Sequence, residues 1–335
     1  MDFSIAHNLI KNKKLIILYD DMEGWEENEV LIPKQSIEVL DKDLKDLNVN
    51  YQILTSKGGV ENIVKKFNPS STVIFNWVES INDEPNTFHL ISPIYEKYNF
   101  IYTGSDSRTL ELTTYKNETL KILEDSNVQI PITSYYGNCY NVDWNVFPCI
   151  VKPCAEHGSD GITNRSVVDD LNQLILRIGE ISKKFNNGVI VQEFLDGTEY
   201  NVSIWGNKIL EHLPISSMEY SDFEDYHDRI CGFDAKWNPE STSFDRVKTI
   251  CPTILPKYLE EKISTLAKNA YVATGCRDYG RIDIKLKNHE PVVIDVNSNP
   301  DLSIDAGFYR SASFAGFNYG QMFVQIAGFA VERSL

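Results

Sequence analysis

The chain has 335 residues, 42% of them hydrophobic and 24% charged, which is typical of a globular protein with two or three domains. Its formal net charge of -16 argues against nucleic-acid and membrane-surface partners, because no surplus of cations is left to neutralise phosphates. The six cysteines form no C-x-x-C pair, and the sequence shows neither a signal-peptide core nor a membrane-spanning apolar run. We therefore expect a reduced enzyme located in the cytoplasm.

Residues 1–108 alternate short apolar strands with helices. The pattern predicts strands at 14–19, 51–54, 72–78 and 100–103, and helices at 33–47, 60–67 and 87–98. This alternation is typical of a doubly wound α/β domain. No G-x-G-x-x-G follows the first strand, so the sequence gives no support for dinucleotide binding.

Residues 109–206 follow a different pattern, in which strands surround one helix. After a helix at 110–126, we predict strands at 132–136, 149–152, 161–168, 189–195 and 199–205, with a helix at 170–185. Strands with a segregated helix predict an α+β lobe.

Residues 207–335 form a second α+β lobe in this prediction. It contains a long polar stretch, 218–247, and loops of this length are usually lids or binding loops. We expect residues 221–247 to be a mobile lid. Helices at 256–274 and 312–330 flank a hairpin.

The hairpin at 280–300 reads as two alternating strands with a three-residue turn at 288–290. That turn places Asp283 opposite Asp295, Arg281 opposite Asn297, and Leu286 opposite Val292. Facing carboxylates repel each other, and Mg²⁺ would offset the repulsion, since it prefers carboxylates together with nucleotide phosphates. We expect both carboxylates to be exposed. The alternative is a solvated polar face on an ordinary hairpin.

Two other segments could bind a nucleotide. Lys152 ends an apolar strand, and the loop with Gly158 and Ser159 could close its backbone over an anion. The strand 189–195 could offer an edge to an adenine, and Glu199 beyond it could bind ribose hydroxyls. The alternatives are a glycine-containing β-turn and a plain hairpin.

Seven motifs occur in register along the chain: Tyr102-Thr103-Gly104-Ser105, Tyr115-Lys116, Ile150-Val151-Lys152-Pro153, Gln192-Glu193-Phe194-Leu195-Asp196-Gly197-Thr198-Glu199, Asp234-Ala235-Lys236-Trp237, Gly280-Arg281-Ile282-Asp283 and Asp295-Val296-Asn297. In this order and spacing they resemble the ATP-grasp superfamily, specifically its D-alanine–D-alanine ligase-like branch. The resemblance implies an ATP-grasp fold, in which the α/β domain precedes two α+β lobes that clasp ATP.

The resemblance also implies roles for individual residues, which follow in chain order: Glu27 for the amine of the first substrate; Lys116, Lys152, Gly158 and Ser159 for phosphates; Gln192, Glu193, Phe194 and Leu195 for adenine; Glu199 for ribose; Lys236 for the terminal phosphate; Arg281 for the oxyanion of acyl transfer; and Asp283, Asp295 and Asn297 for Mg²⁺, with Mn²⁺ as an alternative.

The sequence departs from the family in the segment that should contact the second substrate. Asp301 stands where the ligases have a glycine, Ala306 replaces a serine, and Asp305 is adjacent. An aspartate beside a substrate carboxylate would repel it. Smaller departures are Asp295 in place of a glutamate and the segment from His157 to Asp160 in place of a serine-rich loop.

We therefore expect an ATP-dependent carboxylate–amine ligase that forms an amide through an acyl phosphate, with amino-acid-like small molecules as substrates. One alternative is D-alanine–D-alanine ligase itself, and another is a nucleotide-binding protein without catalysis. The sequence does not determine the oligomeric state, and a homodimer is one candidate.

Overall fold

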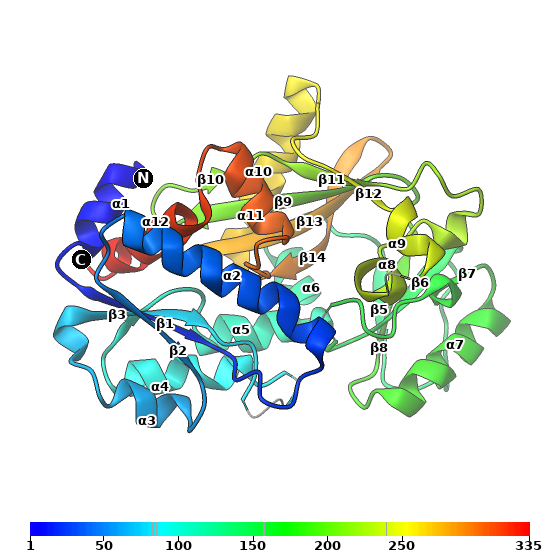
Figure 1. The fold of residues 1–335 in the computed structure, drawn as a ribbon. Coiled ribbons are helices and arrows are strands. Elements are labelled where there is room, and N and C mark those ends of the chain that lie inside the picture. The colour runs from blue at the N-terminus through cyan, green and yellow to red at the C-terminus, as the bar shows by residue number, and fades with distance from the viewer. Residues whose placement is uncertain (82–83, 85, 157, 239) are drawn as a thin grey trace.

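The computed structural model describes residues 1–81, 84, 86–156, 158–238 and 240–335, so His157 lies outside the described residues. The described residues form three β-sheets (Figure 1). None of the helices in the described part of the chain is long and apolar enough to cross a membrane.

The N-terminal sheet is parallel and has the order β2-β1-β3-β4, as a doubly wound domain requires. Its elements are α1 (Phe3–Ile10), β1 (Lys14–Tyr19), α2 (Glu27–Asp46), β2 (Tyr51–Thr55), α3 (Val60–Val64), β3 (Thr72–Trp77), α4 (Ser92–Lys97) and β4 (Ile101–Tyr102), with 3-10 turns at Pro69–Ser71 and Phe88–Leu90.

Helix α2 begins earlier than predicted. The prediction used Pro33 as the first residue, but the helix begins at Glu27, and Pro33 lies inside it. The reason is a capping box, in which the Glu29 carboxylate accepts from the Glu26 backbone N–H at 2.9 Å. Glu27 therefore stands in the first helical turn rather than in a loop.

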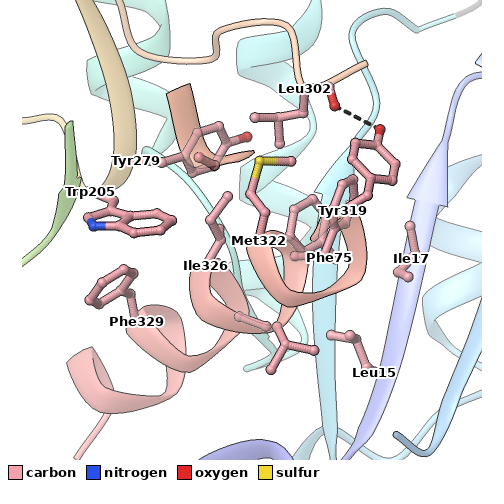
Figure 2. Close-up of a cluster of buried hydrophobic side chains, with 14 of the residues drawn as sticks. Leu15, Ile17, Phe75, Trp205, Tyr279, Leu302, Tyr319, Met322, Ile326 and Phe329 are labelled. Atoms are coloured by element: carbon pink, nitrogen blue, oxygen red, sulfur yellow. Dashed lines mark hydrogen bonds between the residues drawn. The ribbon is translucent and has the colours of Figure 1, made fainter. Parts of the chain in front are cut away.

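The core of the N-terminal domain is completed by the last helix of the chain. Helix α12 (Tyr319–Arg333) packs against β1 and β3 and lies beside α1 (Figure 1). Figure 2 shows Phe75 of β3 facing Tyr319, Met322 and Ile326 of α12. A Cβ at Gly328 would meet the Cβ of Ala6 at 2.5 Å, so α1 and α12 approach closely only because this residue is glycine.

A single helix at 312–330 was predicted, and the structure has two. Helix α11 (Gly307–Phe314) ends before Gly316, whose φ of +94° is left-handed. Asn318 then caps α12 by accepting from the Gln321 backbone N–H at 2.8 Å. The predicted helix at 110–126 is likewise divided into α5 (Ser107–Thr114) and α6 (Lys116–Asp125), because Tyr115 has an extended conformation.

The central lobe is an antiparallel sheet of order β5-β8-β6-β7, with α7 (Leu171–Lys184) packed against it. Its strands are β5 (Thr133–Tyr136), β6 (Cys149–Pro153), β7 (Val167–Val168) and β8 (Val189–Glu193). The predicted strand at 161–168 is mostly a loop with a 3-10 turn at Asn164–Ser166, and only its last two residues pair.

The C-terminal lobe is a six-stranded sheet covered by α10 (Lys257–Ala273). Its strands are β9 (Glu199–Gly206), β10 (Glu211–His212), β11 (Ser216–Glu219), β12 (Lys248–Ile250), β13 (Asp278–Lys287) and β14 (Glu290–Asn297). Strand β9 pairs with β13 and is therefore part of this sheet, whereas the predicted limit after residue 206 placed it in the central lobe. The other predicted domain limits remain a proposal.

The hairpin differs from the prediction in its turn but not at its carboxylates. Only two residues, Asn288 and His289, connect β13 to β14, and both have positive φ, which suits a primed hairpin turn. Leu286 therefore faces Pro291 instead of Val292. A bulge after Asp283 restores the predicted pairs Asp283–Asp295 and Arg281–Asn297.

We predict that Phe323→Ala lowers the free energy of unfolding by about 3–5 kcal/mol, because it leaves a cavity in this core. The Phe323 ring is buried and stacks on Phe75 with centroids 4.3 Å apart. Urea denaturation followed by fluorescence measures the change. Val272→Ala on the exposed face of α10 is the control, and an equal effect of the two substitutions would contradict the packing role.

Candidate nucleotide and metal site

A cavity of about 100 Å³ lies between the central lobe, the predicted lid and the β13–β14 hairpin. It brings together most of the residues predicted to bind ATP. Its wall comprises Pro131, Ile150, Lys152, Ser159, Ile162, Gln192, Glu193, Phe194, Leu195, Glu199, Ile230, Cys231, Lys236, Asp283, Lys285, Ile294 and Asp295.

Asp283 is the most constrained carboxylate of the site. Arg281 donates to it through Nε at 2.8 Å and Nη2 at 2.9 Å, and Asn297 Nδ2 donates at 3.0 Å. Asn201, directly opposite on β9, donates at 2.9 Å. Burial opposes its ionisation, but the Arg281 guanidinium and these hydrogen bonds hold the pKa of Asp283 below its usual value.

The expectation that both hairpin carboxylates are exposed is wrong for Asp283, which is 5% exposed. It lies buried because β9 covers β13 on the side away from β14. Asp295 is partly exposed and lines the cavity. Arg281 and Asn297 are not themselves on the cavity wall and reach the site through Asp283.

The donor set suits a hard divalent cation. Two facing carboxylates and the Asn297 amide are oxygen-bearing groups of the kind that Mg²⁺ and Mn²⁺ prefer. Within the described residues, no three His, Cys, Asp or Glu side chains are arranged to hold a metal by themselves. The residues therefore fit an ion whose remaining ligands come from nucleotide phosphates and water.

Lys152 projects into the cavity from the end of β6. Its ammonium donates to Gln192 Oε1 at 2.9 Å, and Gln192 in turn donates to Thr133 Oγ1 at 3.1 Å. The predicted adenine contact Gln192 is thus also the residue that orients Lys152. Burial, only partly offset by Asp295, lowers the pKa of Lys152 to about 8. Lys116 lies nearby, and its ammonium donates a hydrogen bond to the backbone oxygen of Glu156 at 2.7 Å.

The hinge at the end of β8 is fixed by side-chain contacts. Glu193 accepts from Lys287 Nζ at 2.6 Å and from the Ile132 backbone N–H at 2.8 Å. Its carboxylate is therefore engaged, and so is its backbone N–H, which donates to the Ile132 backbone oxygen at 3.0 Å. What Glu193 can offer an adenine is its backbone carbonyl. Glu199, at the start of β9, lines the cavity and accepts from Asn201 Nδ2 at 3.3 Å.

The predicted lid contains three short helical segments, a 3-10 turn at Tyr226–Asp228, α8 (Phe233–Trp237) and α9 (Thr242–Arg246). It is docked over the cavity, because Ser159 Oγ donates to the Cys231 backbone oxygen at 2.8 Å. Lys236 of α8 lines the cavity, and its charge helps to lower the pKa of Asp283. The mobility of this segment remains a prediction.

The predicted substrate residues lie elsewhere. Glu27 is exposed on α2, and Asp301 is exposed and accepts from the Ser303 backbone N–H at 2.8 Å. Desolvation and the nearby Asp301 raise the pKa of Asp305. None of these three is on the wall of the nucleotide cavity.

A residue that sequence reasoning missed lies near Asp301. The side chain of Glu79 reaches solvent, yet desolvation and the carboxylates of Asp301 and Asp20 raise its pKa to about 8. Glu79 and Asp20 follow β3 and β1, so their proximity could have been inferred from the shared carboxyl edge of a parallel sheet. Asn201 gave no sequence signal, because its role depends on the β9–β13 register.

Comparison with known proteins identifies the chain's relatives. Residues 133–327, more than half of the chain, match the family model described as "D-ala D-ala ligase C-terminus". The chain belongs to this family. The predicted ATP-grasp fold and D-alanine–D-alanine ligase-like relationship are confirmed, and the protein is an ATP-dependent carboxylate–amine ligase of that type.

Two curated relatives match this chain over about three quarters of their own length. The "Uncharacterized protein y4sG" of Sinorhizobium fredii is 29% identical over 270 residues, which cover 79% of this chain and 76% of that protein. The "D-alanine--D-alanine ligase" of Desulforamulus reducens is 26% identical over 255 residues, with coverages of 72% and 77%.

Solved structures of ligases in this family share the fold. The Bacillus anthracis D-alanine–D-alanine ligase complexed with ATP superposes with a TM-score of 0.71 at 19% identity, over 96% of this chain and 98% of that one. The VanG D-Ala:D-Ser ligase of Enterococcus faecalis superposes with a TM-score of 0.70 at 19% identity, over 95% and 99%.

We predict that Asp295→Asn lowers ADP release at least about 100-fold while changing stability little, because a half-buried side chain loses one charge at the metal position. Asp283→Asn should lose activity and also unfold at lower urea concentration, since its new amide faces Arg281. ADP release at several Mg²⁺ concentrations measures the first effect. Near-wild-type turnover of Asp295→Asn would contradict the metal assignment.

We predict that ATP affinity falls as the pH rises above about 8, where the free protein loses the Lys152 proton. Below that pH the ammonium is charged, and a bound triphosphate favours the charged form. Above it, each pH unit should weaken binding by up to about tenfold. Titration of the dissociation constant from pH 7 to 9.5 measures this slope, which Lys152→Arg should remove. A flat wild-type profile would contradict the assignment.

Proposed function

We propose that this ligase joins two amino-acid-like substrates. ATP phosphorylates the carboxylate of the first, and the amine of the second displaces phosphate to form an amide, with release of ADP. The observation that carries this proposal is the convergence of Lys152, Lys236, Asp283 and Asp295 on one cavity, with Arg281 fixed beside them.

Each residue has a definable task in this scheme. Lys152 and Lys236 would hold phosphate oxygens, and Arg281 would stabilise the oxyanion formed when the amine attacks. The bidentate contact to Asp283 keeps the Arg281 guanidinium in place before substrate arrives. A divalent ion bound at Asp283, Asp295 and Asn297 would neutralise charge on the transferred phosphoryl group. Glu27 remains the proposed partner of the first substrate's amine.

The second substrate is the point at which this chain should differ from its named relatives. Asp301 and Asp305 replace the groups that would receive a carboxylate. Asp20 is a further acidic side chain beside Glu79, whose own carboxyl, with a pKa of about 8, is mostly protonated at neutral pH. Like charges about 4 Å apart cost roughly 4 kcal/mol at an effective dielectric of about 20, or about a thousandfold in affinity. We propose an acceptor that presents a cationic or hydroxyl group here, and not D-alanine.

The alternative to a substrate role is a structural salt bridge between Arg310 and these aspartates. Arg310 donates to the backbone oxygen of Asp305 at 2.9 Å, and no salt bridge joins its side chain to the Asp301 or Asp305 carboxylate among the described residues. Its charge favours the ionised form of Asp305, but the pKa of Asp305 remains raised by desolvation and by Asp301. D-alanine–D-alanine ligation remains the second candidate, because relatives over most of the chain carry that name. Mn²⁺ as an alternative ion, a homodimer and a cytoplasmic location stay predictions.

We predict that amino acids with a cationic or hydroxyl side chain, and amino-group metabolites of that kind, stimulate ADP release more than D-alanine does. Asp301→Gly should shift the preference toward acceptors that present a carboxylate, by about tenfold or more, because it removes one repulsive charge. An ADP-release screen of D- and L-amino acids and dipeptides measures both.

Asp46→Gly, a change in an exposed aspartate at the end of α2, is the control and should leave the preference unchanged. Efficient synthesis of D-alanyl-D-alanine by the wild-type protein would contradict the proposal. An unchanged acceptor preference in Asp301→Gly would do the same.

A further inference from the structure

Lys285 is a buried cation to which the ligase scheme assigns no role. It is 7% exposed, stands on β13 two residues after Asp283, and lines the nucleotide cavity. Its ammonium donates to the backbone oxygens of Leu195 and Gly197, each at 3.0 Å. It forms no ion pair with a carboxylate whose position the structure describes.

A buried ammonium without a carboxylate partner is costly unless its donors are used. Lysine has three N–H donors, and the two carbonyl oxygens occupy two of them. The ammonium also lies over two aromatic rings, 5.8 Å from the Phe194 centroid and 5.1 Å from that of Tyr220. One donor and a partly desolvated charge therefore remain for a ligand in the cavity.

The position of Lys285 indicates which part of a nucleotide it would meet. Leu195 and Gly197 belong to the segment after β8 that leads from the proposed adenine hinge to Glu199, the proposed ribose ligand. Lys116, Lys152 and Lys236 are the cations assigned to phosphates. Lys285 thus stands at the nucleoside end of the site, where the acceptors are uncharged base nitrogens and ribose oxygens.

We propose that Lys285 is a nucleotide-binding residue that donates a hydrogen bond to an uncharged acceptor of the nucleoside and thereby sets nucleotide affinity. The inference rests on the proposed nucleotide site and adds to it a contact that the motifs do not contain. Lys285 also links the base end of the site to the proposed metal ligand Asp283, because Asp283 and Lys285 lie on one face of β13.

Lys285→Met tests the proposal by equilibrium binding of ATP, ADP and AMP to the full chain. A charge-assisted hydrogen bond to the nucleoside should be lost equally for all three, at about 10- to 100-fold in the dissociation constant. A loss that grows with the number of phosphates would overturn the proposal, since it would mean that Lys285 acts on phosphate charge. No loss would overturn it as well.

Lys262→Met is the control for the change in net charge, because Lys262 pairs with Glu290 on the surface, and it should bind all three nucleotides like the wild type. If Lys285→Met does not fold, Lys285→Gln, which keeps an N–H donor without the charge, replaces it with a smaller expected loss of about 3- to 10-fold. A failure of the wild-type protein to bind ATP would defeat the proposed function, and this inference with it.

A thermodynamic cycle separates direct contact from a distorted hinge. ATP analogues that each lack one acceptor, the 2′-deoxy, 3′-deoxy, 1-deaza, 3-deaza and 7-deaza forms, are measured with both proteins. Direct contact predicts that at least one analogue binds the wild type about tenfold more weakly and that this penalty vanishes in Lys285→Met. Equal penalties in the two proteins for every analogue would overturn the proposal and leave Lys285 a structural role only.

Discussion

The charge of Asp283 is the constraint on which the functional face of the C-terminal sheet depends. A buried carboxylate is tolerated only when several donors surround it, and here they come from three adjacent strands. Asn201, Arg281 and Asn297 converge only in one register of β9, β13 and β14. A slip of one residue would turn every side chain of a strand to the opposite face. Strand register and site geometry are therefore the same requirement.

The hairpin shows how a prediction can be right at the site and wrong beside it. Alternation and a turn signal were enough to pair Asp283 with Asp295, although the assumed three-residue turn does not exist. The two-residue turn shifts the distal pairs by one, and the bulge after Asp283 shifts the proximal pairs back. The bulge also turns Val293 into the core beside Ile284 and leaves Ile294 on the cavity wall, which simple alternation reversed. Alternation cannot reveal a bulge, because the extra residue only changes the phase of the pattern.

Helix ends were predicted less well than the strands of the N-terminal sheet, for a local reason. Pro33 misled the start of α2 because the capping box of Glu26 and Glu29 outweighed it, and the break before α12 needed Gly316 and Asn318 to be read together. Side-chain contacts that depend on the pairing of distant strands and loops could not be predicted. Asn201 reaches Asp283 across 82 residues of sequence, and Lys285 reaches Leu195 across 90. The motifs identified the nucleotide machinery and the departures at Asp301 and Asp305, whereas the fold added Glu79 and Asp20 to that acidic group.

Helix α12 has a consequence for how the protein is made. The apolar face of β1 and β3 that meets Phe323 stays open until residues more than two hundred positions later have been synthesised. Long-range contacts of this kind form late, because the closure entropy of the intervening chain must be met first. During translation the emerging N-terminal sheet therefore presents Leu15, Ile17 and Phe75 to its surroundings, which is the condition under which nascent chains depend on chaperones to avoid aggregation.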